Sequence, residues 1–96
     1  MSHSLEKHWT ITRERLDHAY KLLATLRSDE HASRCYVEYR DFIDHNELEC
    51  ALAALEAVGE WSALPDEALE GMAVAAESMD LAERAAALRR QKVNHR

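Results

Sequence analysis

The six histidines and two cysteines are the residues of this chain best suited to metal or nucleophilic chemistry. His31 with Cys35 and Asp41 with His45 stand four residues apart, a spacing that shares one helix face. A structural zinc site needs four ligands, and a catalytic one needs three and an open position. The chain has no CxxC, no HExxH and no acidic residue three positions before a histidine. The sequence therefore predicts neither a metal site nor a cofactor.

Cys35 and Cys50 fall on or near apolar helix faces, so both are predicted to be small buried hydrophobic residues without a disulfide. A nucleophilic thiolate is favoured by basic, partly exposed surroundings, whereas this region is rich in acids. Phosphate-binding glycine loops are absent from the sequence. The chain is predicted not to be an enzyme.

The elements that carry these residues are expected to be helices. The 96 residues include 47% hydrophobic residues but two glycines and one proline, which favours helix nearly end to end in a single domain, residues 1–96. A first helix of about twenty residues is predicted over 5–26, because apolar or semi-apolar residues alternate there in steps of three and four. Its seam consists of Leu5, Trp9, Thr12, Leu16, Ala19, Leu23 and Leu26.

A second helix is predicted after Ser28-Asp29-Glu30, and it carries Tyr36 and Tyr39 either in the core or with their hydroxyls at the surface. A third follows a turn at 44–46. Asn46 and Glu49 have the spacing of a reciprocal N-terminal cap, and Gly59 is expected to end this helix in the left-handed conformation.

The remaining chain predicts a helix from Pro65, a bend near Met79-Asp80 and a final helix. Gly71 either weakens the first of these helices or allows another helix to come close. Basic residues in the final helix suit the negative end of its dipole, and the last few residues are expected to fray. The predicted fold is all-α, a compact antiparallel bundle of four to five helices.

The net charge of −6 is unevenly distributed. Residues 29–83 hold fifteen acids against two bases, whereas residues 84–96 hold five bases and no acid. This middle region would repel phosphate, so no nucleic-acid partner is expected. No apolar run reaches the ~20 residues that span a bilayer, and the first residues lack the order of a signal peptide. No membrane partner and a cytoplasmic location are therefore expected.

The density of acids from Glu38 to Glu60 has two interpretations, a solvated face or the binding site of a basic partner. A binding site would use the acids around the 44–46 turn, with the tyrosines as apolar anchors and a histidine that tunes the contact with pH. The candidate residues are Tyr36, Tyr39, Asp41, Asp44, His45, Glu47 and Glu49.

The stretch from Phe42 to Leu55 resembles the block "acidic, His, Asn, Glu, then Ala-Leu-x-x-Leu" of small all-helical immunity proteins. These proteins accompany toxins of bacterial polymorphic and contact-dependent competition systems, including the MafI-like group. The stretch from Leu69 to Met79 is similar to their later Leu-x-x-Ala-Ala-x-x-Met segment, so the resemblance covers about half of the chain.

This resemblance implies an immunity protein that binds a cognate toxin domain, a basic and nuclease-like one, and neutralises it through an acidic face. The alternative is a structural or regulatory helical module that forms a homo-oligomer through the heptad-like seam of its first helix.

Overall fold

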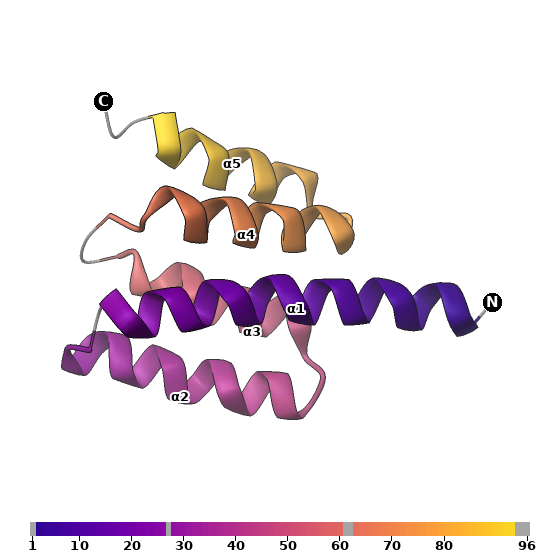
Figure 1. Ribbon diagram of the computed structural model, residues 1–96, viewed down its shortest axis with the longest axis horizontal. Coiled ribbons are helices and arrows are strands. Elements are labelled where there is room, and N and C mark those ends of the chain that lie inside the picture. Colours follow the sequence, from indigo (N-terminus) through magenta and orange to yellow (C-terminus); the bar gives the residue numbers. More distant parts are fainter. Residues whose placement is uncertain (1, 27, 61–62, 94–96) are drawn as a thin grey trace.

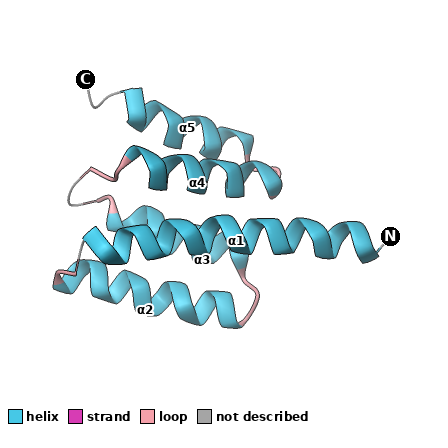
Figure 2. Ribbon diagram, viewed as in Figure 1, coloured by secondary structure: helices cyan, strands magenta, loops and turns pink. Residues whose placement is uncertain are grey.

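The computed structural model describes residues 2–26, 28–60 and 63–93, and these form five α-helices joined by short turns (Figures 1 and 2). The predicted all-α bundle of four to five helices is thereby confirmed. Residues 94–96, which were expected to fray, lie outside the described residues. The helices are α1 (Ser2–Leu26), α2 (Glu30–Asp44), α3 (Leu48–Val58), α4 (Asp66–Ser78) and α5 (Ala82–Val93).

The bundle consists of two helical hairpins, α2 with α3 and α4 with α5, and of α1, which packs against both hairpins. α2 packs against α3, α4 packs against α5, and α1 lies along α4 while it also contacts α2 and α3 (Figure 1). α1 and α4 are antiparallel, because Thr12 meets Ser78 at the end of α4, whereas His18, further along α1, meets Glu67 near the start of α4. The N-terminal part of α1 extends past the ends of the neighbouring helices (Figure 1).

The small side chains of α4 allow this helix to be covered on several sides. Its buried residues include Ala68, Ala73 and Ala75, and the backbone of α1 passes close to Gly71. A Cβ atom at Gly71 would lie 3.5 Å from the carbonyl oxygen of Arg15. Of the two interpretations of this glycine, the close approach of another helix is the one observed.

The seam predicted along α1 is used inside the chain itself. Leu16, Ala19 and Leu23 are fully buried in the core, whereas Trp9 and Leu26, nearer the two ends of the helix, keep 42% and 58% of their surface exposed. The side chain of Leu5 lies outside the described residues. The middle of the seam is therefore unavailable to a second copy of the chain.

Two turns reverse the chain through the same hydrogen-bond pattern. After α2, the Asn46 N–H donates to the Ile43 carbonyl and the Glu47 N–H donates to the Phe42 carbonyl. Asn46 has a φ of 61°, the left-handed conformation that this Schellman motif requires. Asp80 repeats the motif with a φ of 62° at the expected bend after α4.

Two predictions about helix ends, those for Asn46 and Gly59, were wrong. Asn46 ends α2 instead of capping α3, whose first position is preceded by Glu47 without a side-chain cap, so the pairing with Glu49 does not form. Gly59 is right-handed, with a φ of −79°. Its small size instead makes room for Leu64, whose Cγ would lie 3.0 Å from a Cβ atom at this position.

The spacing at Gly71 predicts opposite effects for two substitutions. Gly71→Ala adds a methyl group at ordinary van der Waals distance from α1 and raises helix propensity, so the free energy of unfolding should rise by up to about 1 kcal/mol. Gly71→Leu forces a branched side chain against the α1 backbone and should lower it. Urea unfolding followed by circular dichroism measures both values. A destabilised Gly71→Ala variant would contradict the described helix spacing.

Candidate functional site

The exposed carboxylates at the end of α2 and in the following turn form a continuous acidic surface. Glu38, Asp41 and Asp44 succeed one another at three-residue spacing, which places them along one side of the helix, and Glu47 follows in the turn. All four residues are exposed. This group, Glu38, Asp41, Asp44 and Glu47, is called the acidic turn below.

The acidic turn is held against α1 by one arginine. The guanidinium of Arg13 donates to the Ile43 carbonyl at 3.2 Å and to Asn46 Oδ1 at 2.9 Å. The carbonyls at the end of α2 carry the negative end of its dipole, so a cation is favourable there. No sequence pattern indicated this contact, because Arg13 stands 30 and 33 positions before its two partners.

His45 is part of the same surface. Its Nδ1 donates to the Asp41 carbonyl at 2.8 Å and lies 3.6 Å from the Asp41 carboxylate. The backbone hydrogen bond and the charge of Asp41 raise the pKa of His45 above its usual value. Protonation of this side chain as the pH falls would therefore reduce the negative charge of the acidic turn.

Carboxylates elsewhere in the acidic middle of the chain are neutralised by the basic residues of α5. Arg84 forms ion pairs with Glu49, at 3.5 Å, and with Glu56. Arg89 pairs with Glu70 at 3.0 Å and with Glu77 at 2.6 Å. Sequence reasoning assigned these cations to the α5 dipole and missed the acids that face them.

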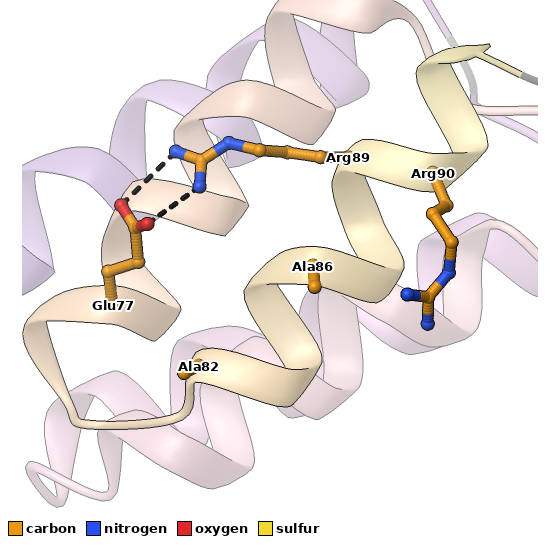
Figure 3. Close-up of a pocket in the computed structure, with 5 residues that line it drawn as sticks. All are labelled: Glu77, Ala82, Ala86, Arg89 and Arg90. Carbon is orange, nitrogen blue, oxygen red and sulfur yellow. Dashed lines mark hydrogen bonds and ion pairs between the residues drawn. The ribbon is translucent and has the colours of Figure 1, made fainter.

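Figure 3 shows the Arg89 side chain reaching Glu77 across the shallow groove between α4 and α5. Arg90 extends in another direction from the next position of the helix. Lys92 adds a contact of 3.0 Å to Glu70. Hydrogen bonds from Arg89 and Lys92 lower the pKa of Glu70 to about 2, and Arg89 also lowers the pKa of Glu77.

The acidic turn has no comparable neutralisation. Within the described part of the chain, no lysine or arginine nitrogen lies within 4.0 Å of the Glu38, Asp44 or Glu47 carboxylates. One group of acids is thus paired with cations of α5, whereas Glu38, Asp44 and Glu47 face solvent. Glu49, one of the predicted binding residues, belongs mainly to the first group.

The two tyrosines predicted as surface anchors are buried. Tyr39 retains 1% of its surface and Tyr36 retains 9%, so neither can act as an apolar anchor at the surface. Their rings pack around Tyr20, which stacks on Tyr39 with ring centres 4.7 Å apart and meets Tyr36 edge to face. The apolar period of α2 turns this side toward α1, which is the reason for their burial.

The residues considered for metal or thiol chemistry are dispersed. Cys35 is buried as predicted, but Cys50 is exposed because it lies just off the apolar stripe of α3. The His31 ring nitrogen lies 2.8 Å from the Ala57 carbonyl and 3.9 Å from Cys35 Sγ. Among the residues that the structure describes, no three histidine, cysteine or acidic side chains are grouped as metal ligands.

None of the helices over the described ranges is both long and apolar enough to cross a membrane. Comparisons of the chain with models of protein families, with curated proteins and with solved structures found no match.

The lowered pKa of Glu70 predicts a loss of stability in acid. Because its folded-state pKa lies below the usual 4.5, the ion pairs stabilise the protein fully above that pH and lose their effect as the pH falls toward 2. Arg89→Met should therefore show a smaller decrease in the free energy of unfolding than the wild type between pH 5 and about 2.

Urea unfolding at a series of pH values measures this difference. Arg90→Met is the matched control, since Arg90 is exposed and extends away from Glu77 (Figure 3). Equal acid sensitivity of the wild type and Arg89→Met would show that the ion pairs do not stabilise the fold.

Proposed function

We propose that this protein is a non-enzymatic immunity protein that binds a basic, nuclease-like toxin domain and neutralises it through the acidic turn. The observation that carries the proposal is a contrast between two groups of acids: several pair with arginines of α5, whereas Glu38, Asp44 and Glu47 have no lysine or arginine partner among the described residues. The resemblance of residues 42–55 to small helical immunity proteins covers the same turn.

Electrostatics gives a physical reason for this choice of surface. Neighbouring carboxylates repel one another, and a basic partner would relieve this repulsion on binding. A negative surface also accelerates the encounter with a positive one, an effect that salt screens. A nuclease presents positive charge to its phosphate substrate, so an anionic surface can occupy the same site.

The first experiment is recovery of partners from native cells with the tagged protein, followed by washes at low and at high salt and mass spectrometry. The expected partner is a protein with a basic domain that is lost more readily at high salt. Expression of that domain should stop growth, and coexpression of this chain should restore it. Recovery of the tagged protein alone would favour the interpretation of the acids as a solvated face.

Charge reversal in the acidic turn tests the surface itself. Asp44→Lys combined with Glu47→Lys should slow association with the recovered domain by at least about tenfold at low salt and abolish growth rescue. Surface plasmon resonance at two salt concentrations measures the association rate.

The matched control reverses two other exposed acids, Glu60 and Glu83, which lie at the far end of α3 and on α5. It makes the same change in net charge. Equal effects of the two double variants would mean that overall charge, and not the acidic turn, governs binding.

Self-association of α1 is the second candidate, and exposed apolar residues on its N-terminal part favour it. Trp9 and Ile11 are 42% and 44% exposed on this part of the helix. Light scattering with size exclusion separates the candidates. The proposed immunity protein is expected to be a monomer, whereas a dimer that Ile11→Glu converts to a monomer would support self-association. Leu16 is unsuitable for this test because it is fully buried.

A further inference from the structure

Trp9 lies on the side of α1 that faces the turn after α2. The guanidinium of Arg13 lies 2.9 Å from Asn46 Oδ1 in this turn, and Trp9 stands four residues before Arg13. Residues four positions apart share one side of a helix, so Trp9 follows Arg13 one helical turn closer to the N-terminus. Figure 1 shows that α1 continues past the end of α2 in this direction. Trp9 therefore lies beside the turn that carries Asp44 and Glu47.

The indole of Trp9 is available for binding. It is 42% exposed and belongs neither to the buried core nor to the partly buried side chains packed against the core. Ile11 is 44% exposed, but two positions along a helix correspond to a rotation of about 200°, so Ile11 lies on the opposite side of α1. Tryptophan is strongly enriched among the residues that dominate binding energies at protein interfaces. The acidic turn thus has an exposed aromatic residue next to it.

The charges beside Trp9 determine which kind of partner fits. Asp44 and Glu47 have no lysine or arginine partner in the part of the chain that the structure describes, whereas Arg13 is engaged with the Ile43 carbonyl and Asn46. Two carboxylates against one guanidinium leave these surroundings negative. A symmetric pairing of two copies of this chain would bring two acidic turns together, which their like charges disfavour. A basic partner can pair with the carboxylates and cover the indole.

We propose that Trp9 is the apolar anchor of the partner-binding surface: its indole is buried against the basic partner while Asp44 and Glu47 pair with cations of that partner. The inference rests on the proposed function, which supplies the partner. It gives a residue of α1 the role predicted for Tyr36 and Tyr39, which are buried. Exposed charges act mainly on association, whereas a buried apolar contact acts mainly on dissociation, so the two contributions are separable.

Binding kinetics test the anchor directly. Trp9→Ala should weaken binding of the recovered basic domain by at least about thirtyfold, chiefly through faster dissociation, because a buried aromatic contact is lost. The effect should persist at high salt, which screens charges but not apolar contacts. Ile11→Ala is the matched control, since Ile11 is similarly exposed on the opposite side of α1. Wild-type dissociation of Trp9→Ala, or an equal effect of Ile11→Ala, in surface plasmon resonance would overturn the proposal.

Fluorine NMR tests burial of the indole without replacing Trp9. The chain is labelled with 5-fluorotryptophan, which reports on Trp9 and Trp61, and Trp61→Phe assigns the two signals. Binding of the unlabelled basic domain should shift the Trp9 signal and reduce its response to the exchange of water for deuterium oxide, because the indole leaves the solvent. An unchanged Trp9 signal in the complex would refute the proposal.

Photocrosslinking in native cells tests the surface without a purified partner. The photoreactive residue p-benzoylphenylalanine is placed at position 9, 11 or 47 in separate variants. Positions 9 and 47 should give an adduct with the same protein, one that carries a basic domain, and position 11 should give none. An adduct between position 9 and a second copy of this chain would overturn the proposal in favour of self-association.

The anchor and the acidic turn can fail separately. An adduct with the basic protein at position 47 but not at position 9 retains the acidic turn and rejects Trp9. An adduct at position 9 that persists in the Asp44→Lys and Glu47→Lys variant retains Trp9 and rejects the acidic turn. Absence of adducts at both positions rejects both.

Discussion

The packing of α4 between α1 and α5 is the constraint on which the rest of the bundle depends. The small residues of α4 let the α1 backbone approach Gly71, and Ala75 and Ala76 are fully buried. Close helix contact at these small residues fills the core together with Leu69 and Met72 of the same helix, which are also fully buried. The acids at the border of α4, Glu70 and Glu77, are thereby brought beside the cations of α5.

The fold determines which of the unevenly distributed charges of the sequence are paired with an opposite charge. Arg84, Arg89 and Lys92 pair with acids on α3 and α4, the two helices that precede α5 in the sequence. None of these three residues forms an ion pair with the acidic turn, which lies at the end of α2. The net charge of the chain therefore understates how negative this surface is, and the pairing in the folded protein reveals which acids remain available.

The sequence predicted the fold well because each helix has its own local signals. Asp29, in the predicted break before the second helix, caps α2 with its side chain accepting from the Ala32 N–H, and the predicted bend after α4 occurs near Asp80. The cap of α3 was wrong because Asn46 suits both an N-cap and a left-handed position. In this structure Asn46 takes the left-handed position, and its side-chain oxygen accepts a hydrogen bond from Arg13.

The candidate site was predictable only in part. The carboxylates of the acidic turn are exposed, as their positions off the apolar stripe indicated. Tyr36 and Tyr39 were candidates for the wrong reason, because both rings are buried and neither offers an apolar anchor at the surface. The pairing of Arg84 with Glu56 joins residues of different helices, and no single-sequence pattern contains such a contact.

The division of the bundle into two hairpins also sets the order in which native contacts can form. α2 with α3, and α4 with α5, are neighbours along the chain, so closing each hairpin costs little loop entropy. The contacts between α1 and α4 join residues about sixty positions apart, such as Thr12 and Ser78. Docking of α1 onto α4 is therefore expected to come after closure of the hairpins, because these contacts span a longer stretch of chain than those within either hairpin.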